Sequence, residues 1–139
     1  ISRQSYQLFP AKVDLLINYM RELLDLYRLA KENVEKFLLE IEERGYSKLL
    51  IYGAGEVAET ILGVIRDRNK DTLKVLAVID DNDEIQGKEL LGYKIISRAD
   101  INHYEHDAVI ITSYAYEDEI RGKLKELNYS ENKIIRFFS

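Results

Sequence analysis

The sequence contains no cysteine, one proline and two histidines among its 139 residues. Without cysteine it can form neither a disulfide framework nor a thiolate zinc site, and a reducing cytoplasm is the expected compartment. No apolar run approaches the roughly 20 residues that span a bilayer, so we expect no membrane partner. The net charge is −5, and the Lys and Arg residues are interspersed with acids. This balance argues against direct nucleic-acid binding by the chain itself.

Glycine and proline are absent from Ala11 to Arg44, which predicts one long helix over residues 11–45. Its apolar positions alternate spacings of three and four, as in a heptad seam. They are Val13, Leu16, Met20, Leu23, Tyr27, Ala30, Val34, Phe37 and Ile41. Pro10 suits the first helical turn and Gly45 the left-handed position after the last one. Residues 1–10 are expected to be a remnant strand or linker.

Such a helix is roughly 50 Å long, which exceeds the width of a small domain. Part of its apolar stripe must therefore find a partner elsewhere, and we expect a homodimer that pairs through residues 11–44. The alternative is a helix that breaks near Asn33 and folds back on its own domain.

After Gly45 the pattern changes to short aliphatic runs separated by helix-compatible stretches, which predicts an α/β domain over residues 47–139. The expected strands are 48–52, 74–79, 93–96, 107–112 and 133–137, with helices over 56–68 and 116–127. These elements predict a Rossmann-like, doubly wound parallel sheet of about five strands in the order 3-2-1-4-5. The link over 83–92 is too short to hold a full crossover helix.

The first predicted strand leads directly into the glycine-rich turn Gly53-Ala54-Gly55-Glu56-Val57-Ala58. In a Rossmann unit the first glycine permits a tight turn, and the second lets a pyrophosphate approach the backbone. A small third residue lets the helix pack against the strand. The free N–H groups at the helix start then bind phosphate, so we predict nucleotide binding at Gly53, Ala54, Gly55, Glu56 and Val57.

Asp80 and Asp81 end the second predicted strand. A carboxylate there accepts hydrogen bonds from ribose hydroxyls and disfavours a 2′-phosphate, which indicates NAD rather than NADP. The alternative is that the two acids only begin a solvated turn. Thr112 and Ser113 follow the fourth strand and are expected to face the same crevice, where they would bond a phosphate or a sugar. For Ser113 the alternative is a cap on the following helix.

Other constellations carry no predicted chemistry. Tyr129 and Lys133 have the Tyr-x-x-x-Lys spacing of short-chain dehydrogenases, but they lie in a predicted loop, where side chains four apart do not meet. His103 and His106 are read as a surface loop rather than a metal site. Gly-x-Ser-x-Gly and Gly-Lys-Ser/Thr motifs are missing, which argues against α/β-hydrolase and P-loop chemistry. We therefore predict no catalytic and no metal-ligating residue.

Residues 48–138 resemble small Rossmann domains related to the CoA-binding fold, in particular the N-terminal domains of bacterial nucleotide-sugar dehydratases and epimerases of polysaccharide synthesis. The matching segments are 51–58, 78–82, 87–95 and 107–111. In those proteins a separate catalytic domain follows, so the resemblance implies ligand binding more than turnover. It makes a UDP-sugar or CoA possible ligands beside NAD.

Residues 2–12 resemble the wing and exit of a winged-helix regulator, and the chain begins at Ile1 without a signal peptide, so we expect a piece of a longer protein. The two resemblances together imply the C-terminal part of a transcription factor whose Rossmann domain senses a nucleotide, as in redox-sensing repressors. The alternative is a fragment of an NAD-dependent nucleotide-sugar dehydrogenase, epimerase or dehydratase. An empty, vestigial site is a further alternative.

Overall fold

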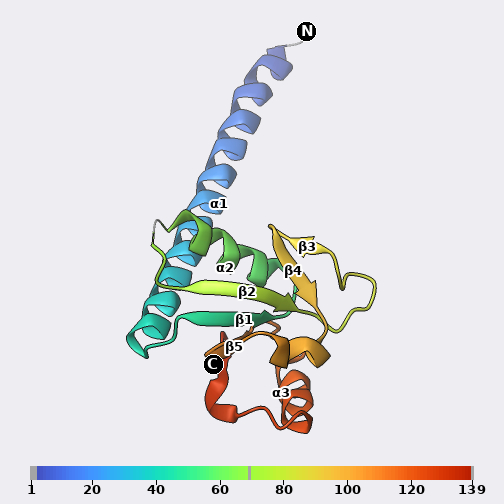
Figure 1. Ribbon diagram of the computed structural model, residues 1–139. Helices are drawn as coiled ribbons and strands as arrows, with labels where there is room; N and C mark the ends of the chain where they lie inside the picture. The colour runs from blue at the N-terminus through green and yellow to red at the C-terminus, as the bar shows by residue number, and fades with distance from the viewer. Residues whose placement is uncertain (1–2, 69, 139) are drawn as a thin grey trace. The chain divides into compact units, whose positions relative to one another are not determined.

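The computed structural model describes residues 3–68 and 70–138, which form two compact units, 1–35 and 36–139. The helices are α1 (Arg3–Glu43), α2 (Glu56–Asp67) and α3 (Glu117–Glu126), with short 3-10 helices η1 (Arg98–His103) and η2 (Glu131–Lys133). The strands are β1 (Lys48–Tyr52), β2 (Lys74–Ile79), β3 (Glu89–Leu90), β4 (Tyr93–Ile96), β5 (Ala108–Ile111) and β6 (Ile134–Arg136). Figure 1 shows these elements along the chain.

Helix α1 is longer than the sequence predicted. It begins at Arg3, so the described part of segment 1–10 is helical rather than a strand or linker, and it passes Asn33 without a break. Pro10 therefore lies inside the helix rather than in its first turn, and it has no N–H to donate to the preceding turn. No helix in the described part of the chain, α1 included, combines the length and the apolar character needed to cross a membrane.

The C-terminus of α1 is closed by the predicted glycine. Gly45 has φ of +86°, and its N–H donates to the Glu42 carbonyl while the N–H of Tyr46 donates to the Ile41 carbonyl. This pair of bonds is a Schellman motif, which satisfies carbonyl groups that the helix leaves unpaired. The turn ends the helix and leads the chain into β1.

The six strands form one sheet in the order β3-β4-β2-β1-β5-β6. All neighbouring pairs are parallel except β3 and β4. Without β3, the order is the predicted 3-2-1-4-5, so the Rossmann-like fold is confirmed. The last two strands are shorter than predicted, since β5 spans Ala108–Ile111 and β6 spans Ile134–Arg136.

The strand β3 was missed. It pairs with β4 through a two-residue turn at Leu91 and Gly92, which have φ of 50° and 85°. Positive φ at both central positions defines the type I′ hairpin turn, whose usual signal is Asn-Gly or Asp-Gly. Leucine seldom adopts this conformation, so the pair Leu91-Gly92 carries no hairpin signal.

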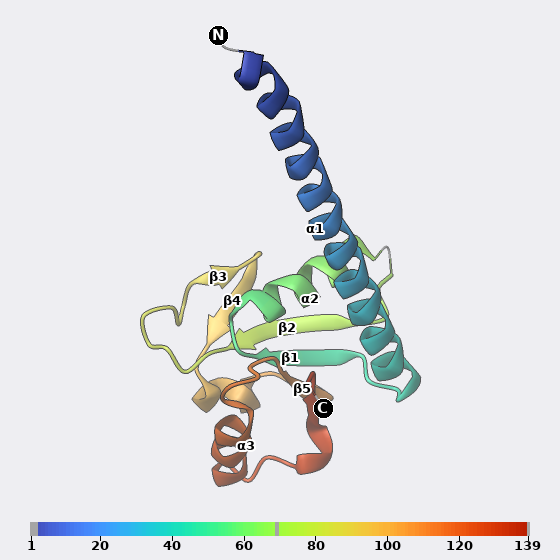
Figure 2. The ribbon, with the colours of Figure 1, turned by 180° about the vertical axis from the view of Figure 1, so that it is seen from behind.

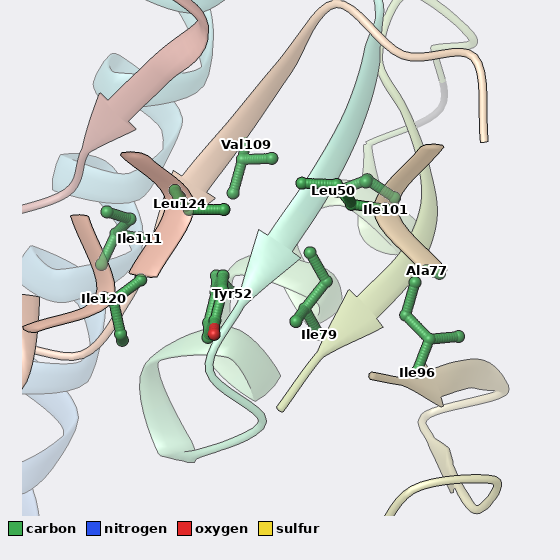
Figure 3. Close-up of a cluster of buried hydrophobic side chains, with 10 residues drawn as sticks. All are labelled: Leu50, Tyr52, Ala77, Ile79, Ile96, Ile101, Val109, Ile111, Ile120 and Leu124. Carbon is green, nitrogen blue, oxygen red and sulfur yellow. The ribbon is translucent and has the colours of Figure 1, made fainter. Parts of the chain in front are cut away.

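The sheet is covered on both faces. On one face, alternate side chains of β1, β2 and β5 pack against η1 and α3; Figure 3 shows this core cluster. Its members are Leu50, Tyr52, Ala77, Ile79, Ile96, Ile101, Val109, Ile111, Ile120 and Leu124. Helix α2 lies over the other face with Ala58, Ile61 and Leu62 fully buried (Figures 1 and 2). Two buried layers hold the strand ends, and the loops that follow them, in place.

Candidate functional site

A cleft of about 680 Å³ lies where the turn after β1 meets the ends of β2 and β5. All nine residues predicted to bind a nucleotide line it: Gly53, Ala54, Gly55, Glu56, Val57, Asp80, Asp81, Thr112 and Ser113. The remaining lining residues include Tyr52, Tyr116, Glu119 and Lys123. The cleft lies beyond the carboxyl ends of β1 and β5, where the chain order in the sheet reverses, which is the usual ligand position in such sheets.

Gly53 lets the turn after β1 pass close to β5. Its φ is +117°, and a Cβ atom here would lie 2.7 Å from Thr112 Oγ1. Thr112 is buried, and its hydroxyl lies 3.1 Å from the Tyr52 carbonyl oxygen and 3.0 Å from that of Gly53. The single hydroxyl proton of Thr112 is therefore directed at the backbone of the turn, and its side chain positions the turn.

The start of α2 presents unpaired backbone donors to the cleft. Gly55 is the N-cap residue and makes no side-chain cap. Among the described residues, none accepts a hydrogen bond from the N–H groups of Gly55, Glu56 and Val57. The Gly55 carbonyl, by contrast, accepts the N–H of Glu59 within the helix. The first N–H groups of any helix lack an intrahelical partner, and the helix dipole adds partial positive charge at this end. This backbone can bind an anionic group.

Asp80 holds the remaining amide of the turn. Its Oδ2 accepts the N–H of Ala54 at 2.8 Å, and its Oδ1 accepts the N–H of Asn82 at 2.9 Å. Gln86 Nε2 donates to the Asp80 carbonyl at 2.8 Å. Asp80 thus faces the cleft, and each of its carboxylate oxygens keeps a further acceptor position. The N–H of Ala54 is occupied by this contact.

Asp81 lies in an ionic cluster instead. The Tyr52 hydroxyl donates to Oδ1 at 2.7 Å, Lys123 Nζ lies 3.0 Å from Oδ2, and Arg98 Nη1 lies 3.4 Å from Oδ1. Burial raises the pKa of Asp81, but the hydrogen bonds from Tyr52 and Lys123 and the charges of Lys123 and Arg98 lower it by more, so the carboxyl pKa falls below its ordinary value. The cluster ties the end of β2 to β1, η1 and α3.

The same cluster changes the acidity of its donors. Burial, followed by the hydrogen bond to Asp81, raises the pKa of Tyr52 above its ordinary value. The hydrogen bond to Asp81 also raises the pKa of Lys123, and the contact with Tyr52 raises that of Arg98. Tyr52 is therefore a neutral donor and Lys123 a fixed cation at the wall of the cleft. Sequence reasoning found none of these three partners of Asp81, because they come from distant segments.

Ser113 lies in the turn before α3 and does not cap that helix, whose N-cap residue is Tyr116 and which has no side-chain cap. Its Oγ accepts the N–H of Tyr116 at 3.3 Å, in the turn that leads into α3. Tyr116, the N-cap residue of α3, lines the cleft and is 62% exposed. The aromatic ring of Tyr116 is therefore free to contact a ligand, while the hydroxyl of Ser113 shapes the turn.

The expectation of a surface loop at His103 and His106 was half wrong. His103 is exposed and lies 3.5 Å from Asp100, but His106 is buried. His106 Nδ1 lies 2.7 Å from the Tyr104 carbonyl oxygen, and its Nε2 lies 2.8 Å from the Tyr129 hydroxyl. Tyr129 is thus part of the protein's packing and does not line the cleft. Within residues 3–68 and 70–138, no three His, Asp or Glu side chains gather closely enough to hold a metal ion.

Comparison with known protein families identifies the family of this chain. A family model described as C2185-like, N-terminal, matches residues 45–135. The chain belongs to this family. The match runs from the turn before β1 into β6, and it includes every residue that lines the cleft. No curated protein matches the chain.

Solved structures with a similar fold include a sugar-nucleotide dehydrogenase and a repressor. UDP-D-quinovosamine 4-dehydrogenase from Vibrio fischeri is 19% identical with a TM-score of 0.52, and the match covers 66% of this chain and 77% of that one. RSP, a Rex-family repressor solved with beta-NAD+ and operator DNA, is 11% identical with a TM-score of 0.52 over 73% of this chain and 56% of its own. The chain therefore spans little more than half of the repressor. At these identities the likeness establishes a Rossmann-like fold and nothing finer.

Proposed function

We propose that the chain is a nucleotide-binding, ligand-sensing module whose ligand is a dinucleotide of the NAD type. The observation that carries this proposal is the trio of N–H groups at Gly55, Glu56 and Val57, which have no acceptor among the described residues and belong to the lining of the cleft. Amides in this position bind phosphate. The cleft volume of about 680 Å³ lies in the usual range for small-molecule sites.

The charges of the cleft favour NAD over NADP. Four acids, Glu56, Asp80, Asp81 and Glu119, line it against the single cation Lys123. A 2′-phosphate would meet this negative field, whereas the ribose hydroxyls can donate to Asp80. Asp80 keeps free acceptor positions for them, while Asp81 is engaged by Tyr52, Lys123 and Arg98. We assign ribose recognition to Asp80 and the support of the cleft wall to Asp81.

A regulatory role fits a module of this kind. RSP, solved with NAD+, NADH and operator DNA, has a similar fold over the matched region. In our proposal α1 pairs two copies of this chain, and the ligand binds two arrangements of the pair with different affinity. The contact with DNA would come from a segment other than residues 1–139, since the net charge of −5 disfavours the phosphate backbone.

The second candidate is a fragment of an NAD-dependent nucleotide-sugar dehydrogenase, epimerase or dehydratase. The likeness in fold to the Vibrio fischeri dehydrogenase, 77% of whose chain is matched, favours it. This chemistry needs an acid or base close to the nicotinamide and the sugar. Hydride transfer from a UDP-sugar to NAD+, followed by NADH absorbance, would select this candidate over a sensor.

Calorimetric titration with NAD+, NADH, NADP+, CoA and a UDP-sugar tests the binding proposal. One substitution separates the backbone amide from the side chain, because Glu56 is the first residue of α2. Proline is tolerated at that position, so Glu56→Pro removes the N–H without breaking the helix. Glu56→Ala removes the same carboxylate and keeps the N–H, which makes it the matched control.

We expect NAD+ or NADH to bind more tightly than NADP+. We expect Glu56→Pro to weaken binding about tenfold relative to Glu56→Ala, the effect of one charge-assisted hydrogen bond. Tighter binding of CoA or a UDP-sugar than of NAD+ or NADH would support the phosphate-binding site but show that its ligand is not a dinucleotide. Equal affinity of Glu56→Pro and Glu56→Ala, or no binding of any of the five ligands at millimolar concentration, would refute the site.

A further inference from the structure

The segment of α1 between Val13 and Ala30 is apolar around most of its circumference. The large side chains on it are all exposed in the single chain: Val13, Leu15, Leu16, Ile17, Tyr19, Met20, Leu23, Leu24, Leu26, Tyr27 and Leu29. At 3.6 residues per turn they occupy roughly two thirds of the helix surface. A surface helix usually buries an apolar stripe of about 100°, so a segment that is apolar over roughly two thirds of its surface requires neighbours on more than one side.

The remaining third is a narrow polar stripe. Its centre consists of Asp14, Asn18, Arg21, Asp25 and Arg28, whose spacings alternate between four and three residues, and Glu22 adjoins it on one side. Arg28 Nη2 lies 2.7 Å from Asp25 Oδ1, and both side chains are about 70% exposed. This ion pair is satisfied within the helix itself and is suited to face solvent. The stripe therefore marks the outer face of whatever assembly the helix forms.

The apolar area is large enough for a stable interface. With about 200 Å² for each of the large side chains, roughly half exposed, the segment presents on the order of 1,000 Å² of apolar surface. Contiguous apolar patches on soluble monomers seldom exceed a few hundred Å², while a standard interface buries about 800 Å² per partner. Within the unit 1–35 the only described element is α1, so this unit has no core of its own.

A pair of helices cannot cover this surface. In the heptad that begins at Val13, a two-helix seam buries the a and d positions, such as Leu16 and Leu23, and leaves the flanking e and g positions at its edge. Here the flanks are also apolar: Ile17 and Leu24 at e, Tyr19 and Leu26 at g. Charged residues are usual at these flanks in two-stranded coiled coils. Each helix therefore needs two neighbours, which a four-helix bundle supplies.

We propose that four copies of this chain assemble through α1, as a dimer of the dimers proposed above, into a four-helix bundle over residues 13–30. The polar stripe of each helix lies on the outside, and the e and g positions are buried between dimers. A membrane surface is a poorer partner for this helix, since membrane-surface helices carry a polar face rich in Lys and Arg. The polar residues here include three acids, Asp14, Glu22 and Asp25, against two arginines, Arg21 and Arg28.

The assembly is tested on the full ligand-free chain by sedimentation velocity and native mass spectrometry. The unmodified chain should have four times the 16.2 kDa chain mass. Leu24→Glu places a carboxylate on a flank of the seam, and the mass of the assembly should fall by half, to that of a dimer. Leu23→Glu places it in the seam and should give single chains. Asn18→Glu adds the same charge to the polar stripe and should keep the full mass.

If the unmodified chain has the mass of two chains, the bundle is overturned, and the dimer of the proposed function is still supported. Equal masses for Leu24→Glu and Asn18→Glu would overturn it as well. A single-chain mass would overturn the bundle, and co-sedimentation with phosphatidylglycerol vesicles would then show that this helix face binds a lipid surface. Because no nucleotide is present, none of these results depends on binding in the cleft, and loss of binding there leaves the mass measurement intact.

Discussion

Gly53 is the residue on which the shape of the phosphate-binding turn depends. Its φ of +117° is strained for any L side chain, and a Cβ atom would lie 2.7 Å from Thr112 Oγ1. We expect Gly53→Ala to lower the free energy of unfolding by about 2–4 kcal/mol, through backbone strain and displacement of Thr112. Urea denaturation measures the loss.

The matched control for this substitution is Gly63→Ala. Gly63 lies inside α2, where a Cβ atom meets nothing within 4 Å, so alanine should preserve or raise stability by up to about 1 kcal/mol. Equal stability of Gly53→Ala and Gly63→Ala would show that the turn is not constrained as described.

Asp107 joins the starts of two central strands through hydrogen bonds that depend on its charge. Its Oδ2 accepts the N–H groups of Ser47 and Lys48, both at 2.8 Å, and these bonds lower the pKa of the carboxyl. A lowered folded-state pKa means that the stabilisation is present above the unfolded value near 4 and is lost as the pH falls through the folded value.

We therefore expect Asp107→Asn to lower the free energy of unfolding by about 1 kcal/mol at pH 7. The difference should shrink as the pH falls below about 4, because the protonated wild-type carboxyl then resembles the amide. Chemical denaturation of both proteins across this range measures it. A difference that stays constant down to the acid limit would assign the effect to packing rather than charge.

At the scale of elements, the hairpin of β3 and β4 contains the clearest local conflict between sequence and backbone. Leu91 adopts φ of 50° at the first central position of a type I′ turn and is more than one third exposed. Asparagine is favoured there, and a leucine side chain in this region costs about 1 kcal/mol. We expect Leu91→Asn to raise the free energy of unfolding by about 0.5–1 kcal/mol. Lower stability of Leu91→Asn would mean that Leu91 packs more tightly than its exposure indicates.

The larger elements were predictable because their patterns are local. Short aliphatic runs at β1, β2, β4, β5 and β6, with a glycine turn after the first, determine a Rossmann-like order by general rules of chain connection. The same rules bring Gly55, Asp80 and Thr112 to one cleft. The predictions that failed concern features that depend on unusual turns or on partners distant in the chain. The β3 strand lacked its Asn-Gly signal, and the start of α1 was hidden by Pro10.

The different fates of Asp80 and Asp81 illustrate the second cause. Both acids directly follow β2, and nothing in the sequence distinguishes them. The side chain of Asp80 meets the turn at Ala54, whereas that of Asp81 meets Tyr52 and Lys123, which lie 29 and 42 residues away in the chain. No pattern of spacing reveals such pairs. For the same reason, the burial of His106 beneath Tyr129 could not be read from a polar segment.

For the whole molecule, the two compact units predict two separable dependences of stability. Residues 1–35 offer α1 as a surface for self-association, and residues 36–139 contain the sheet and the cleft. A folded state that only an assembly stabilises becomes more stable with protein concentration, whereas a ligand that binds only the folded sheet stabilises it by about 2.7 kcal/mol at 100 times its dissociation constant.

Hydrogen exchange followed by mass spectrometry can read the two units in one experiment. Dilution should speed exchange in peptides from 13–30 and leave β1 and β5 unchanged, since the sheet has its own buried core. Addition of NAD+ should slow exchange at the turn from Gly53 to Val57 and, through the stability of the sheet, in β1 and β5. Because most helical stability in proteins comes from packing, protection of 13–30 that does not change on dilution would contradict self-association through α1.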